Sequence, residues 1–399
     1  MLKNLYAIKG GITAPKEFIA GGIAAGLKKG KLDLGLVHSK RRAICAGFFT
    51  SNKIKAAPVL LSSSIINKPV HRAVIINSGC ANCLTGKKGL LDSKLITRRL
   101  AGLLGVKESE VLICSTGAIG KRLNAKKIIS ALPGLIKALS IRGAKEMAQA
   151  IMTTDTYPKQ IARAFRVGDK EVRIGGVAKG AGMIAPNMAT MLCVITTDAD
   201  ISKSTLKKAC KEAVDASFNC ITVDGDMSTN DTLLCFANGA SEVKIEPQSN
   251  IYNKFVETLT QVSLLLANLI VNDGEGATKF IEIQITGAKT PAQAKKVAFG
   301  IANSNLVKTA VYGGGSNIGR IASACGAPDV DIRQNRLDIY VNGKKMIKGG
   351  IARSIKGSGN IFKRKNIEIE CDLKLGKASH RVYTCDLSPK YMKINAEYN

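Results

Sequence analysis

The sequence predicts an α/β protein made of two closely packed lobes, each with layered sheets and helices. The chain has 399 residues, which is more than one ordinary core fills and enough for two lobes. Apolar residues make up 45% of it, and strand-like runs alternate with helix-like segments along most of its length. We find no internal repeat, low-complexity block or long linker.

In the first half, two β-branched apolar runs are typical of buried strands that stop at a turn. They are "RAVIINSG" (72–79) and "EVLICSTG" (110–117), which end in Ser-Gly and Thr-Gly. Helical spacing follows in two segments, 124–140 and 143–156, and Pro133 interrupts the first of them.

The second half begins with a strand-like run, "TMLCVITTDA" (190–199). An amphipathic helix is predicted over 201–218, with Ser202 or Ser204 as its N-cap, and a buried helix over about 252–270. "FIEIQITGAK" alternates like a half-exposed strand. We predict a strand, a glycine-rich turn and a short helix for "TAVYGGGSNIGRIASACG" (309–326), and mostly strands after that.

Charge and cysteine content exclude several function classes. The net charge is +29, but the lysines are spread along the chain, Trp is absent and aromatics are 5%, so we expect a solvated surface and no nucleic-acid partner. No run of about 18 uninterrupted apolar residues indicates a membrane span, and the start lacks a secretory signal, so we expect a cytoplasmic protein.

The eleven cysteines lie mostly in apolar stretches, which is typical of buried free thiols in a reducing compartment. Cys80 and Cys83 form a C-x-x-C. A zinc site needs a second pair of ligands, and the three histidines are scattered, so no metal is expected.

The segment "KGAGMIAPNMATMLCVITTDA" (179–199) poses the main functional question. A loop with two glycines and a proline leads through Ala189-Thr190 into an apolar strand. Thr190 is either a strand-entry residue or a nucleophile that attacks the carbonyl before it, so that the chain cuts itself and the new α-amino group serves as base. The residues alone leave both interpretations open.

Other motifs also allow both a structural and a functional interpretation. Thr116-Gly117 and "NSGCAN" are ordinary strand-to-helix turns or sources of oxyanion donors. "TVDGDMSTNDT" (222–232) lacks the terminal Glu of a calcium loop, and is a hydrogen-bonded turn or one wall of a polar site. Glu275, between two glycines, can receive a cationic group. The glycine-rich stretch 312–320 is only a weak nucleotide signal.

Eight blocks, in order along nearly the whole chain, resemble the ornithine acetyltransferase family, the bifunctional glutamate N-acetyltransferases of arginine biosynthesis. They include "KGAGMIAPNMATML", "NSGCANCLTGKKG", "CSTGAIGKRL", "AIMTTDTYPK", "ITVDGDMSTNDT", "VNDGEGATKF" and "YTCDLSPKYMKINAEY". The resemblance implies a self-processing architecture of the N-terminal-nucleophile type. Cleavage between Ala189 and Thr190 would give an α chain (1–189) and a β chain (190–399), associated as an α2β2 heterotetramer.

The resemblance also implies the site. Thr190 would be the acetyl-accepting nucleophile, Thr116 and Gly117 the oxyanion hole, and Thr153, Lys179, Thr190, Glu275 and Asn395 the substrate contacts. The implied reaction is ping-pong transfer of acetyl from N-acetylornithine to glutamate without a cofactor; it leaves open whether acetyl-CoA is a second donor. The types of Lys179 and Glu275 suit a substrate carboxylate and an amine.

Several positions depart from the family pattern. Cys80 replaces an Asn, Gly315 an acid and Ile318 a tryptophan, and the sequence ends one residue before a usual small hydroxyl residue. A related self-processing amidohydrolase, which uses water as acceptor, and a basic scaffold that binds acidic partners are the alternatives. The high lysine content has no mechanistic account beyond solubility and genome composition.

Overall fold

The computed structural model describes residues 5–185, 191–354 and 360–397, and these fold as two compact units. Unit 1 takes the chain up to Met183, the stretch that ends at Asn219, and Asp226–Ile270. Unit 2 takes the short stretch that begins at Ile184, Cys220–Gly225, and the chain from Val271 onward. The prediction of an α/β protein with layered sheets and helices is confirmed.

Unit 1 is built on a sheet in which nine strands pair among the described residues. The order is β1-β6-β7-β8-β10-β3-β4-β5, with β2 also paired to β3. The strands are β1 (Leu5–Ala7), β2 (Phe18–Ile23), β3 (Leu34–Phe49), β4 (His71–Asn77), β5 (Val111–Ser115), β6 (Lys159–Val167), β7 (Lys170–Lys179), β8 (Leu192–Thr197) and β10 (Thr232–Ala237). β9 (Asp200–Ile201) and β11 (Lys244–Ile245) form a separate parallel pair.

The 16-residue strand β3 joins the two halves of this sheet. Its first part pairs with β4 and its last six residues pair with β10, and the register with β4 shifts between His38 and Ala43. β4 and β5, the two runs predicted from "RAVIINSG" and "EVLICSTG", are parallel neighbours. Their C-terminal ends therefore meet at one edge, where the turns that follow them lie together.

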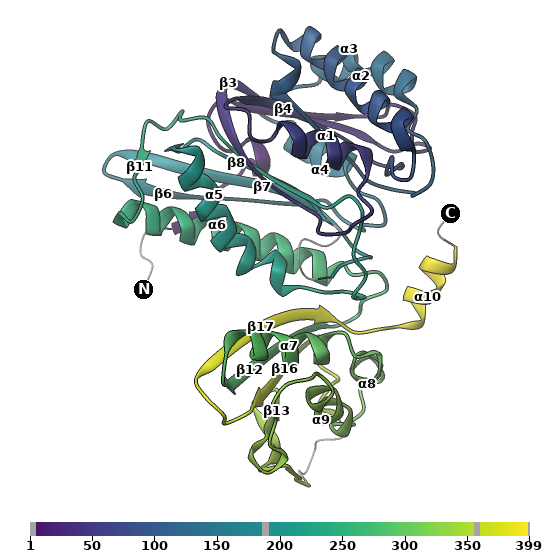
Figure 1. The fold of residues 1–399 in the computed structure, drawn as a ribbon, viewed down its shortest axis with the longest axis vertical. Coiled ribbons are helices and arrows are strands. Elements are labelled where there is room, and N and C mark those ends of the chain that lie inside the picture. Colours follow the sequence, from purple (N-terminus) through teal and green to yellow (C-terminus); the bar gives the residue numbers. More distant parts are fainter. Residues whose placement is uncertain (1–4, 186–190, 355–359, 398–399) are drawn as a thin grey trace. The chain divides into compact units, whose positions relative to one another are not determined.

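Helices cover both faces of the β3–β5 part (Figure 1). On one face, α1 (Ala57–Ile65), α2 (Gly86–Leu104) and α3 (Ala125–Lys137) share a core with the strands, and α4 (Ala144–Ala150) packs on the other. The predicted interruption at Pro133 is wrong: α3 continues through this residue to Lys137. α5 (Lys203–Asp215) begins after Ser202, whose side chain accepts from the Thr205 N–H, so Ser202 rather than Ser204 is the N-cap.

α6 (Asn250–Asn272) is the predicted buried helix. Its buried residues recur with helical spacing, and Val262 and Leu266 lie so close to β7 that a Cβ on Gly176 would be 2.8 Å from Leu266. Among the described helices, α6 alone is long and apolar enough to cross a membrane by length and composition. Core helices pass the same test, and half of its most apolar window is buried.

Unit 2 has a sheet in the order β15-β14-β13-β16-β12-β17 within the described residues. The strands are β12 (Phe280–Ala288), β13 (Asp338–Val341), β14 (Lys344–Lys348), β15 (Ile351–Ala352), β16 (Asn366–Asp372) and β17 (Ala378–Cys385). Burial alternates along β12 and β16, as predicted for "FIEIQITGAK", because one face packs against α7 (Pro291–Ala302) and its neighbours while the other is partly exposed.

The predicted strand at residues 309–312 is wrong: these residues belong to α8 (Asn305–Gly313). Ser304 caps this helix by accepting from the Val307 N–H, and Val307 and Val311, four residues apart, both enter the core. A short β-branched run has no period of its own, so the cap and the i, i+4 pair decide. The predicted turn and short helix are present, with Gly314 as the left-handed C-cap of α8, followed by α9 (Gly319–Gly326).

Candidate active site

The predicted oxyanion pair, Thr116 and Gly117, lies directly after β5 against the turn that follows β4. The Thr116 N–H donates to the Asn77 carbonyl at 3.0 Å, and Cys80 forms isolated β-bridges with Thr116 and Ala118. Gly117 has a φ of +129°, and a Cβ there would lie 2.3 Å from the Gly79 carbonyl carbon. Only glycine fits this position, because the obstacle is backbone that cannot turn aside.

Asn230, which the sequence analysis did not single out, holds these two turns together. Its side-chain amide donates to the Ala81 carbonyl at 2.7 Å and to the Ser115 carbonyl at 2.8 Å. Both acceptors are buried main-chain groups that would be costly to leave unpaired. Asn230 lies within "STND", part of the motif that was noticed only for its acidic residues.

Lys179 ends β7 and is brought to Thr116. Its side chain is 4% exposed, and its Nζ donates to Thr116 Oγ1 at 3.4 Å. An ammonium group has no acceptor, so Thr116 Oγ1 must accept here, and its own hydrogen is left to be donated elsewhere. This contact orients the Thr116 hydroxyl as a donor, which is what an oxyanion requires.

Asp155 is the central group of this part of the molecule, and the sequence analysis missed it. One carboxylate oxygen accepts from Lys159 Nζ at 2.6 Å and from the Gly180 N–H at 2.8 Å; the other accepts from the Thr153 N–H at 2.9 Å. Burial raises the pKa of Asp155, but Lys179, Lys159 and these donors outweigh it and lower that pKa to about 2. Asp155 thereby ties the predicted Thr153 to the residue after Lys179.

A third lysine, Lys28, approaches the same place from the loop after β2. Buried Asp33 fixes that loop by accepting from the N–H groups of Leu27 and Lys28 at 2.6 and 2.8 Å. Lys28 Nζ donates to the Met152 carbonyl at 2.8 Å, next to Thr153. Burial lowers the pKa of Lys28 to about 8; Lys31 and Lys179 add to this effect, and Asp33 and Asp155 oppose it.

We predict that Lys28 is unusually reactive toward amine reagents. At pH 8 about half of it is neutral, whereas an ordinary lysine is less than about 1% neutral, so substoichiometric acetic anhydride should label Lys28 about tenfold faster than exposed Lys29 despite its partial burial. Peptide mass spectrometry over pH 6–10 measures both rates. Equal rates, or no inflection for Lys28 near pH 8, would contradict the lowered pKa.

The predicted residues of unit 2 also meet. Glu275 follows α6 and is buried, and Asn395 lies on α10 (Pro389–Ala396) and donates to Glu275 Oε2 at 2.8 Å. The backbone approach is close, because a Cβ on Gly276 would lie 2.5 Å from the Tyr391 nitrogen. Ala189 and Thr190, the predicted cleavage pair, lie outside the described residues.

Cys80 and Cys83 are buried and free in the structure, as are the other nine cysteines. The described residues contain no group of three or more His, Cys, Asp or Glu side chains arranged to hold a metal ion. Burial raises the pKa of the Cys80 thiol, against the effects of the Asn82 main chain and Lys121. This thiol is therefore not activated as a nucleophile.

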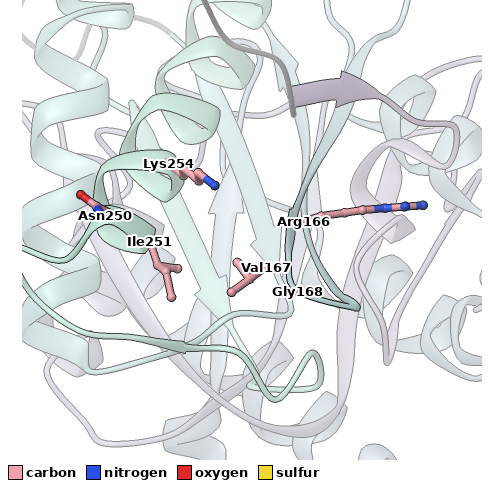
Figure 2. A pocket seen from close by; sticks show the side chains of 6 residues that line it. All are labelled: Arg166, Val167, Gly168, Asn250, Ile251 and Lys254. Carbon is pink, nitrogen blue, oxygen red and sulfur yellow. The ribbon is translucent and has the colours of Figure 1, made fainter.

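A separate surface hollow of about 400 Å³ lies between the β6–β7 turn and the first turn of α6 (Figure 2). Its lining residues are Arg166, Val167, Gly168, Asn250, Ile251 and Lys254. Figure 2 shows the Arg166 side chain extending away from Ile251 and Lys254, so the polar groups do not converge on one point. None of the predicted site residues that the structure describes lines this hollow.

Buried Lys179 contacts the Thr116 hydroxyl beside the Gly117 turn, within an α/β fold. Hydrogen-bond donors held in this way suit an enzyme site that stabilises negative charge. The model of the ArgJ family matches residues 19–399. The chain therefore belongs to the ArgJ family of enzymes, and the resemblance found in the sequence is confirmed.

Two similar relatives have names that refer to arginine biosynthesis or to acetyl transfer to glutamate. The arginine biosynthesis bifunctional protein ArgJ of Caldanaerobacter subterraneus is 43% identical over 98% of this chain and 99% of its own length. The glutamate N-acetyltransferase of Methanocaldococcus jannaschii is 46% identical over 99% of this chain and all of its own length. A crystal structure of ArgJ from Bacillus halodurans is 38% identical, covers 47% of this chain and 98% of that one, and has a TM-score of 0.44.

Proposed function

We propose that this chain is a self-cleaving glutamate N-acetyltransferase that moves acetyl from N-acetylornithine to glutamate. The observation that supports it most is the Lys179–Thr116 contact, held beside Asp155 at the entrance to the loop that leads to Thr190. Family membership supplies the reaction class. The name glutamate N-acetyltransferase, given to one relative, is the reason to propose acetyl as the transferred group and glutamate as the acceptor.

In the proposed processing step, Thr190 Oγ attacks the Ala189 carbonyl carbon, and the peptide C–N bond breaks as the nitrogen takes the hydroxyl proton. Water then hydrolyses the resulting ester, which frees the Ala189 carboxylate and the Thr190 hydroxyl. The new α-amino group of Thr190 serves as general base in the transfer reaction.

In the proposed transfer, Thr190 Oγ attacks the acetyl carbonyl of N-acetylornithine. Thr116 and the Gly117 N–H bind the oxyanion, ornithine leaves with a proton, and acetyl remains as an ester on Thr190. The glutamate amine then attacks this ester by the reverse route. The substrate carboxylates are attracted by Lys28 and Lys179, and Thr153, Glu275 and Asn395 are further proposed substrate contacts, Glu275 for the ornithine ammonium.

The sheet of unit 1 explains how two cleaved chains would stay together. β8 and β10 follow the predicted break, and they lie between β7 and β3, which precede it. Six residue pairs join β7 to β8, and six join β10 to β3. Separating the α and β chains would therefore break two complete ladders in the middle of one sheet. The α2β2 heterotetramer that the family resemblance implies would contain two copies of the cleaved α and β chains.

Intact mass spectrometry of the purified protein tests the proposal. We expect fragments that end at Ala189 and begin at Thr190, and transfer of acetyl from N-acetylornithine to glutamate. Release of acetate without glutamate would favour the amidohydrolase instead, and a single intact chain would overturn the proposal. Acetyl-CoA supplied as sole donor tests the proposed second activity. We also propose that the enzyme is cytoplasmic, in keeping with the packing of the apolar helix α6 on β7.

A further inference from the structure

The loop that leads from Lys179 toward the predicted break contains a residue in an unfavourable backbone conformation. Met183 has a φ of +58°, in the left-handed region that side chains other than glycine seldom adopt. Such a conformation costs about 1–2 kcal/mol and persists only where neighbouring contacts impose it. The next residue, Ile184, provides those contacts.

Both main-chain groups of Ile184 are bound by the turn at residues 222–225. Its carbonyl accepts from the Val223 N–H at 2.9 Å, with longer contacts from the next two N–H groups. The Thr222 hydroxyl lies 3.0 Å from this carbonyl and also contacts Asn303 Oδ1 at 2.7 Å. Its own N–H donates to Asp224 Oδ1 at 2.8 Å. The Ile184 side chain is fully buried. Ile184 is therefore fixed in direction as well as in place.

The Asp224 carboxylate is itself held from a second side. Tyr391, in the first turn of α10, donates its hydroxyl to Asp224 Oδ2 at 3.2 Å. A carboxylate with one oxygen on the Ile184 N–H and the other on a tyrosine hydroxyl has a defined orientation. This turn lies within "TVDGDMSTNDT", and of the two sequence interpretations the hydrogen-bonded turn describes residues 222–225.

We propose that Asp224 is a positioning residue for self-cleavage. It holds Ile184 in place and so restricts the segment from Ile184 to Ala189, here called the leader, which ends at the bond that breaks. The inference depends on the self-cleavage proposed above. Intramolecular attack is fast only when the nucleophile and the carbonyl are held in a reactive geometry. Ile184 is five residues before Ala189, so loss of the clamp would free the leader and lower the population of that geometry.

The test is the rate of chain cutting in newly synthesised protein, followed by denaturing gel and intact mass. We expect Asp224→Ala to cut at least about tenfold more slowly than wild type, which corresponds to loss of one charge-assisted hydrogen bond. Asp224→Asn should stay within about threefold, because the amide oxygen still accepts from the Ile184 N–H. Asp169→Ala is the matched control, an exposed carboxylate in the β6–β7 turn, and should cut at the wild-type rate.

A second variant guards against simple misfolding. Thr222→Val keeps the shape but removes the hydroxyl that contacts both the Ile184 carbonyl and Asn303 Oδ1. We expect slower cutting, measured at a temperature at which circular dichroism shows that the variant is still folded. Wild-type cutting by both Asp224→Ala and Thr222→Val, or equal slowing by Asp169→Ala, would overturn the clamp. An uncut wild-type chain would instead overturn the proposed function, so the two failures are distinguishable.

Discussion

Thr190→Ala should remain a single chain of 399 residues and should lose acetyl transfer by at least about a thousandfold. Alanine lacks the hydroxyl that is proposed both to attack the Ala189 carbonyl and to accept acetyl, so one substitution removes both reactions. Intact mass spectrometry measures the cutting, and transfer of labelled acetyl from N-acetylornithine to glutamate measures the activity.

Thr190→Ser is the matched control, because serine keeps a hydroxyl on Cβ and loses only the methyl group. It should still cut and still transfer acetyl, although at lower rates. An uncut Thr190→Ala protein with wild-type transfer would show that the nucleophile lies elsewhere. A cut Thr190→Ala chain would show that another residue or a contaminating protease breaks the chain.

The sequence was sufficient to predict the pieces of the unit 1 site but not what holds them together. Thr116, Gly117, Thr153 and Lys179 were predicted through the family resemblance, and the structure joins Lys179 to Thr116 and links Thr153 to Gly180 through Asp155. Asp155 was overlooked although it lies within "TTDT". Its importance comes from Gly180, 25 residues away, and no local pattern encodes that contact.

Lys28 was overlooked for a different reason. In a chain with 59 lysines and arginines, one more lysine in a polar loop carries no information. What distinguishes Lys28 is partial burial next to Lys179 and Asp155, and this arises only when the loop after β2 closes around Asp33. Helices α5 and α6 were predicted well. The helix predicted over 143–156 ends at Ala150, and residues 309–312 are helical because the capping of α8 outweighs a short β-branched run.

Substitution of Asp155 should have the largest effect on stability. Asp155 and Lys159 form an ion pair with both side chains fully buried. Asp155→Ala would leave the Lys159 ammonium buried without a counter-charge, and we expect the free energy of unfolding in urea to fall by about 3–5 kcal/mol. The matched control is Asp215→Ala, which breaks the exposed i, i+4 pair with Lys211 and should leave the unfolding free energy unchanged within error.

The pH dependence of stability has a definite sign at this site. The pKa of Asp155 is lowered from 3.8 to about 2 in the folded protein, so its stabilising contribution is complete above about pH 4 and is lost as the pH falls toward 2. Wild type should lose unfolding free energy over that interval more steeply than a double variant, Asp155→Leu with Lys159→Met, which removes both members of the buried pair and leaves buried Lys179 in place. The double variant should regain only part of that stability and no acetyl transfer, because buried Lys179 lacks its counter-charge and the Thr153 and Gly180 N–H groups lack their acceptor. Recovery of both properties would show that Asp155 serves stability alone and does not position the site.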